Sequence, residues 1–214
     1  VQPDRVEALA QSVTREWRRA VDDWITEGQI QLYPRLQELL TRAVCAWAGV
    51  PLPAPEVETR TCHLTALFDQ AGHVGIGHLR SRAARKAADR WAADIIDQIR
   101  AGKLDPPPSS AAYVVAHHRE VDGRPMAPRV AAVELLNVLR PTVATAVYIT
   151  FVAHALDAHP AWKERLASGD GSEDGASAAA APCGKKHPTD FPWTLGSIQP
   201  GNVNCCSKAI HAGC

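Results

Sequence analysis

The sequence predicts a mainly α-helical protein with an irregular C-terminal tail. Up to about Leu166, apolar residues recur at three- and four-residue steps, as they do on one face of a helix. No segment shows the convincing alternation of apolar and polar residues that a half-buried strand requires. Hydrophobic residues make up 46% of the chain, which is enough to build a packed core. We therefore divide the chain into a helical part, residues 1–170, and a tail, residues 171–214.

Four helices are predicted in the first hundred residues. The first covers 1–24, where apolar side chains fall on one helical face. The second covers 32–47 and ends at Gly49, because a glycine followed closely by a proline stops a helix. The third covers 57–68. The fourth covers 79–100, with a basic start and one face that is formed by Trp91, Ile95, Ile96 and Ile99.

A short helix at 111–118 follows a proline-rich linker, and a long apolar stretch at 126–156 is predicted as one central helix. About 30 helical residues span about 45 Å, which is long enough to cross a domain. The most apolar part, 141–156, is shorter than the ~20 residues of a membrane span, and it contains several polar side chains. A buried central helix is therefore favoured over a membrane span.

Charge and cysteine content exclude several function classes. Lys plus Arg and Asp plus Glu both number 23, so zero net charge draws the chain to neither nucleic acid nor an anionic membrane. The sequence opens without an apolar signal-peptide core, so we expect a cytoplasmic protein. The tail cysteines fit no zinc spacing, and the adjacent His117 and His118 are typical of a solvated surface. No metal site is predicted.

The feature that carries chemistry is Arg140 followed by Pro141. An arginine inside an apolar helix is unfavourable unless it is paired, and its guanidinium matches a carboxylate in two parallel hydrogen bonds. The proline removes the hydrogen bond to the carbonyl of Asn137 and kinks or widens the helix. The two residues predict an opening with a fixed cation at its rim, suited to the acid end of a ligand. The alternative is an internal salt bridge, with Glu134 as the candidate partner.

The flanking residues resemble one family. The run ELLNVLRPTV at 134–143 is similar to the central helix of peroxide-using fatty-acid hydroxylases and decarboxylases, a branch of the cytochrome P450 superfamily. The run CAWAGVPL at 45–52 is similar to that branch's Cys-x-Trp-Ala-Gly-Val-Pro-Leu. Shorter matches at 80–91, 99–104 and 158–162 follow in the same order and spacing. The resemblance covers residues 1–170, the central part of the family's fold.

The resemblance implies an enzyme that uses hydrogen peroxide to hydroxylate or decarboxylate a fatty acid, with haem as cofactor and no redox partner protein. In this branch the arginine that matches Arg140 binds the substrate carboxylate. The carboxylate then serves as the acid–base group, because an arginine that is always protonated is a poor proton donor. Arg140 and Pro141 are thus the expected catalytic residues, and Asn137 and Pro141 are expected beside the haem.

Two departures from the family change the expectation for this chain. The run GIGHL at 75–79 stands where relatives usually have Gly-Pro-Arg-His-Trp. After the central helix, the relatives' Glu-x-x-Arg helix and glycine-rich loop with the iron-ligating cysteine do not appear, and the tail begins instead. We expect a truncated, inactive fragment that lacks the haem ligand, through a frameshift, a premature end or a gene-model error. The alternatives are a non-enzymatic helical domain and a haem-free fatty-acid-binding fragment.

Overall fold

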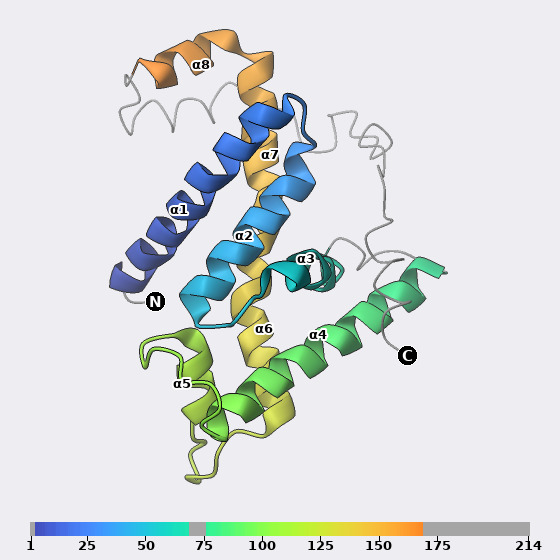
Figure 1. Cartoon of the computed structure of the whole chain (residues 1–214), viewed down its shortest axis with the longest axis vertical. Coiled ribbons are helices and arrows are strands. Elements are labelled where there is room, and N and C mark those ends of the chain that lie inside the picture. The colour runs from blue at the N-terminus through green and yellow to red at the C-terminus, as the bar shows by residue number, and fades with distance from the viewer. Residues whose placement is uncertain (1–2, 69–75, 169–214) are drawn as a thin grey trace, which may run out of the picture. The chain divides into compact units, whose positions relative to one another are not determined.

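The computed structural model describes residues 3–68 and 76–168, and the tail predicted at 171–214 lies outside them. The chain divides into two compact units, with the boundary between Val147 and Tyr148. In the described ranges all regular elements are helices, apart from an isolated β-bridge between Arg119 and Pro125 (Figure 1). The predicted mainly α class is confirmed.

The helices follow the predicted order. Their bounds are α1 (Pro3–Glu27), α2 (Leu32–Ala48), α3 (Val57–Thr65), α4 (Ile76–Arg100), α5 (Ala111–His117), α6 (Pro128–Ala144), α7 (Ala146–Ala158) and α8 (Pro160–Ala167). A 3-10 turn, η1 (Ala54–Glu56), leads into α3. The first unit therefore contains α1 to α6, and most of α7 with α8 falls in the second.

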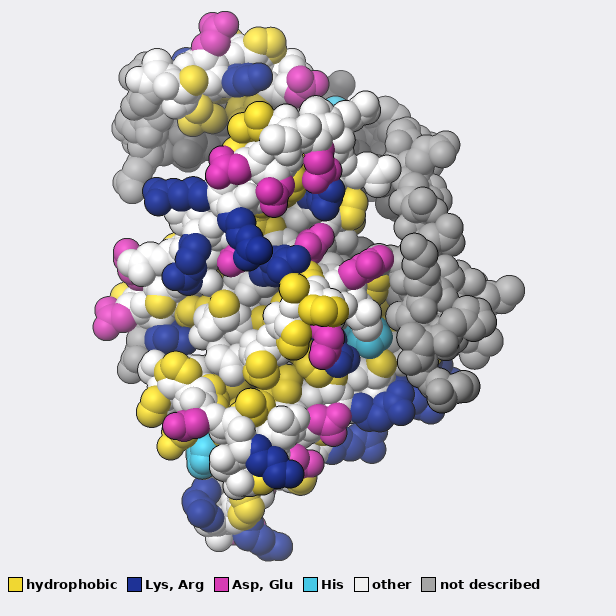
Figure 2. Space-filling model, in the orientation of Figure 1, with side chains coloured by type: hydrophobic (Ala, Val, Ile, Leu, Met, Phe, Trp, Pro, Cys, Tyr) yellow, Lys and Arg dark blue, Asp and Glu magenta, His cyan; other side chains and the backbone are white. Residues whose placement is uncertain are grey.

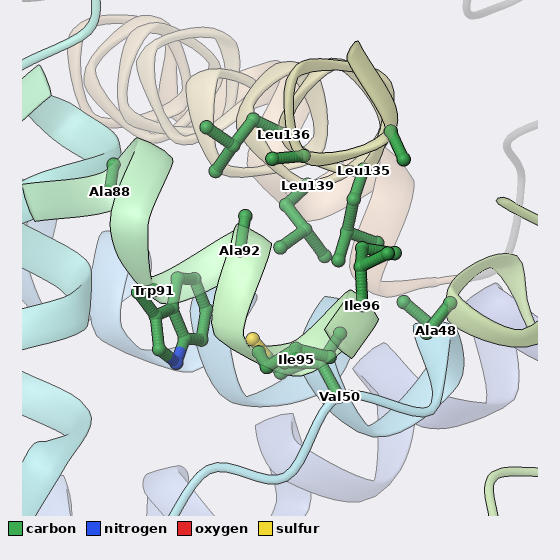
Figure 3. Close-up of a cluster of buried hydrophobic side chains, with 14 of the residues drawn as sticks. Ala48, Val50, Ala88, Trp91, Ala92, Ile95, Ile96, Leu135, Leu136 and Leu139 are labelled. Atoms are coloured by element: carbon green, nitrogen blue, oxygen red, sulfur yellow. The ribbon is translucent and has the colours of Figure 1, made fainter. Parts of the chain in front are cut away.

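The core of the first unit forms around α6, which contacts α2, α3, α4 and α5 (Figure 1). Figure 3 shows Leu135 and Leu139 of α6 pointing toward Ala92 and Ile96 of α4. All four side chains are at most 3% exposed, and each buried leucine contributes about 1.5–3 kcal/mol relative to an exposed one. The face of α4 that the sequence predicted is buried, since Trp91, Ile95, Ile96 and Ile99 all belong to this core.

The segment CAWAGVPL connects α2 to two other helices. The Trp47 indole donates to the Arg5 carbonyl at 2.9 Å, and the Arg5 guanidinium donates to the Trp47 carbonyl at 3.2 Å. Gly49 ends α2 in the left-handed conformation, with φ at 74°. A Cβ atom there would lie 2.7 Å from the Ser110 Oγ and 2.8 Å from the Pro106 Cβ. Only glycine combines this dihedral with so close an approach to the start of α5.

α1 packs with a face that coincides only in part with its apolar one, since Leu9 and Val13 are half-buried. It packs on α2, where the buried Ser12 hydroxyl donates to the Ala43 carbonyl at 3.0 Å. By contrast, Val6 is 54% exposed and Trp17 is 40% exposed. The Trp17 ring contacts that of Trp24 edge to face at 5.7 Å. The apolar periodicity therefore identified the helix correctly and the side that packs only in part.

The predicted central helix is present but interrupted. α6 ends at Ala144 and α7 begins at Ala146. Six side chains of α6 are buried. Among the described residues of α7, one is buried, Ala146. The stretch 128–158 is long and apolar enough to cross a membrane by length and composition alone, and a core helix passes the same test. The expectation of a buried helix is thus met by α6, which belongs to the first unit.

Candidate functional site

The three predicted site residues lie together on one side of α6. Asn137, Arg140 and Pro141 are three and four residues apart, a spacing that places side chains on the same helical face. Asn137 and Pro141 are exposed, and Arg140 is half-buried beside the fully buried Leu139. This face of α6 therefore lies at the boundary between the buried core and the exposed surface.

Arg140 makes no hydrogen bond or salt bridge with any residue that the structure describes. Its neighbours one turn away are Leu136, Asn137, Val143 and Ala144, and none of them carries a charge. All other described arginines that are half-buried have partners. Arg42 and Arg60 pair with glutamates four residues earlier, Arg35 pairs with Glu27, and Arg5 and Arg100 donate to backbone carbonyls. Arg140 is the exception within this set.

The predicted alternative partner, Glu134, does not pair with Arg140. Six residues separate them on α6, which corresponds to about 120° around the helix axis. Glu134 is exposed, and no ion pair joins the two side chains. The internal salt bridge that would have given Arg140 a purely structural role is therefore absent between these two described residues.

The helix carries Pro141 in its interior and breaks four residues later. Without an N–H, Pro141 offers no donor to the Asn137 carbonyl. The Thr142 hydroxyl donates to the Val138 carbonyl at 3.4 Å. At the break, both the N–H and the hydroxyl of Thr145 donate to the Thr142 carbonyl, at 3.2 and 2.7 Å. α6 therefore continues through Pro141, and its interruption lies at Thr145, where these two hydrogen bonds stabilise it.

The described cysteines are poorly placed to bind haem iron, because both are buried in the helical core. No group of three or more His, Cys, Asp or Glu in the described ranges could hold a metal. Cys45 and Cys62 are both buried, and Cys45 is a free thiol. Burial raises the pKa of Cys45 to about 12, so this side chain stays a protonated thiol at neutral pH rather than the thiolate that binds iron. The cysteines of the tail lie outside the described residues.

Two hollows on the first unit lie away from Arg140. One has a volume of about 110 Å³ and lies between α1 and α2, where charged side chains such as Arg19, Arg35 and Glu38 line it. The other is lined by α1 residues, including Glu7 and Arg18. Arg140 lines neither of these two hollows.

A second unusual side chain, His63 on α3, was not predicted from the sequence. Its Nδ1 atom is buried without a hydrogen-bond partner among the described residues. Burial first, and then the nearby charges of Arg60 and Arg90, lower the pKa of His63 to about 4. The imidazole is therefore neutral at physiological pH. A lone histidine carries no spacing signal, so only the packing of α3 against α4 reveals it.

Comparison with known proteins gives one consistent result. No protein-family model matches the chain. Among solved structures, cytochrome P450SP alpha (CYP152B1) in complex with (R)-ibuprofen is 54% identical, with a TM-score of 0.75 over 78% of this chain. Cytochrome P450EX alpha (CYP152N1) with myristic acid is 36% identical, with a TM-score of 0.72 over 80% of this chain. Ligand-free cytochrome P450 OleT is 26% identical, with a TM-score of 0.75 over 78%. In each case the match covers 41% of the other chain, so this chain spans about two fifths of their length.

Proposed function

Because this chain is a partial cytochrome P450 of the peroxygenase branch, we propose that its Arg140 binds the carboxylate of a fatty acid that the complete enzyme hydroxylates. The observation that supports this role most strongly is the lack of a described partner for Arg140. A half-buried guanidinium is unfavourable without an anion, and a carboxylate satisfies it through two parallel charge-assisted hydrogen bonds.

Ligands of two similar proteins support the substrate class. One is bound to myristic acid and another to (R)-ibuprofen. Both molecules combine a carboxylate with an apolar body. On this chain, a ligand of that shape would place its carboxylate on Arg140 and its apolar part along the same face of α6. Arginine suits this task better than lysine, because its planar fork fixes the orientation of the bound acid.

In the complete enzyme we infer that the oxidant is hydrogen peroxide and that no electron-transfer protein is required. In the reaction, a C–H bond of the fatty acid becomes C–OH and the peroxide becomes water. The family's haem supplies the oxidising iron. No step through it is assigned to this chain, whose two described cysteines, Cys45 and Cys62, are both buried. Arg140 contributes a position for the substrate carboxylate, and that carboxylate can take up and return a proton, which the guanidinium cannot.

The binding test measures the dissociation constant of one fatty acid for the complete haem enzyme that carries this segment. Four forms are compared: wild type, Arg140→Ala, Arg140→Lys and Arg129→Ala. A charge-assisted pair contributes about 1.5–3 kcal/mol, so Arg140→Ala should raise the dissociation constant about tenfold or more. Arg140→Lys should recover only part of this loss, because an ammonium keeps the charge without the fork.

Arg129→Ala is the matched control. Arg129 is an exposed arginine in the first turn of the same helix, so its removal changes net charge equally. Its effect on the dissociation constant should be less than about twofold. Wild-type affinity in Arg140→Ala, or an equal loss in both alanine variants, would contradict the proposed role.

A further inference from the structure

The zero net charge of the chain conceals a segregation of charge along α4. Arg82, Arg85, Lys86 and Arg90 lie within about two and a half turns, and all four side chains are exposed. Asp89 is the acid among them, and it lies 3.5 Å from Arg85. Figure 2 shows Lys and Arg side chains gathered along this part of α4. We call these four residues the basic face of α4.

The core holds the basic face outward. On the opposite side of α4, Ala84, Ala88 and Trp91 are each at most 8% exposed. Rotating the helix to bury its cations would expose these apolar side chains to water. The Ser81 hydroxyl donates to the Ala66 carbonyl at 3.2 Å and ties the start of this segment to the end of α3. The cations are therefore presented by a rigid element rather than by a loop.

Most of this charge is free to act on a partner. Arg82 and Lys86 lie one turn apart on α4, and neither forms an ion pair with any described residue. Arg90 bonds the backbone carbonyl of Lys86 at 3.3 Å, which leaves its charge uncompensated. With Asp89 offsetting one cation, the basic face has a net charge of about three positive units at neutral pH. A partner that fits it is an extended anionic surface.

We propose that the basic face of α4 docks the protein on an anionic lipid bilayer. Charge complementarity requires an anionic surface, and the fatty-acid substrate, which rests on the proposed function above, favours a lipid one. Fatty acids partition into bilayers with their carboxylates at the surface. Docking there would bring the protein to its substrate. Each cation near such a surface strengthens binding about fivefold, so three net charges give about 100-fold.

The test is co-sedimentation of the full chain with vesicles of phosphatidylcholine alone and of phosphatidylcholine mixed with phosphatidylglycerol. The test variant is Arg82→Gln/Lys86→Gln. The control variant is Arg18→Gln/Arg19→Gln, which removes the same charge from two exposed positions of α1. We expect binding to the anionic vesicles only, weakened about 25-fold in the test variant and within about twofold of wild type in the control. Salt should weaken it as well.

The proposal is overturned if the wild-type chain does not bind the anionic vesicles, or if both double variants lose binding equally. It is also overturned if the chain binds double-stranded DNA as tightly as the vesicles, since the surface would then recognise anions without regard to lipid. Arg140→Ala should bind vesicles as wild type does. Failure of the carboxylate site and failure of the docking surface are thus distinguishable.

Discussion

Replacing Gly49 with alanine should destabilise the first unit by about 2–5 kcal/mol. The backbone at Gly49 has φ of +74°, and an L-residue in this left-handed region costs about 1–2 kcal/mol. The new methyl would lie 2.7 Å from the Ser110 Oγ and 2.8 Å from the Pro106 Cβ. Overpacking of this kind typically costs a further 1–3 kcal/mol. Ser110 also caps α5 by accepting from the Tyr113 N–H at 3.3 Å, so its displacement would weaken that helix.

The assay is urea denaturation followed by circular dichroism, with Gly102→Ala as the control. Gly102 has φ of +67°, and a Cβ atom added there would meet no heavy atom within 4 Å, so this variant isolates the cost of the dihedral. We expect a loss of about 1–2 kcal/mol in the control and a clearly larger loss in Gly49→Ala. Equal losses in the two variants would refute the close approach of α2 to the start of α5.

Three further predictions concern the core and its buried ionisable groups. Because the folded pKa of His63 lies below its usual 6.5, stability should be full above about pH 6.5 and decline as pH falls toward 4. His63→Gln should flatten that decline in urea titrations, and an unchanged profile would contradict it. Leu139→Ala should cost about 2–5 kcal/mol in thermal melts, whereas Val130→Ala, at a position 47% exposed, should cost under about 0.5. The Cys45 thiol should resist alkylation at pH 8 until the chain unfolds, and prompt labelling in peptide mass spectra would show that it is accessible.

The sequence predicted the elements better than their contacts. Periodicity located α2, α4 and α6 because their apolar stripes coincide with the faces that pack. It was only partly right for α1, where a polar contact between Ser12 and Ala43 belongs to the interface and Trp17 stays partly exposed. The break at Thr145 was not predicted either, because it depends on hydroxyl bonds to a local carbonyl rather than on a pattern of residue types.

The residue types of the candidate site were recognised in the sequence, whereas the contacts of Arg140 could be determined only from the structure. An arginine before a proline in an apolar run indicated a carboxylate site, but the same run allowed pairing with Glu134. Only the arrangement around α6 shows that these two side chains do not meet. His63 was beyond sequence reasoning for a similar reason, whereas the basic start of α4 was visible in the sequence and only the direction of its side chains required the structure. Burial and the orientation of cations follow from how α3 and α4 pack.

The most direct test of the carboxylate role is peroxide-driven hydroxylation of a fatty acid and of its methyl ester by the complete haem enzyme that contains this segment. The ester has the same chain but cannot form the charge-assisted pair with Arg140 or shuttle a proton. We expect turnover of the acid, little turnover of the ester, and loss of the acid's advantage in Arg140→Ala. Equal turnover of acid and ester by the wild type, or full activity in Arg140→Ala, would contradict it.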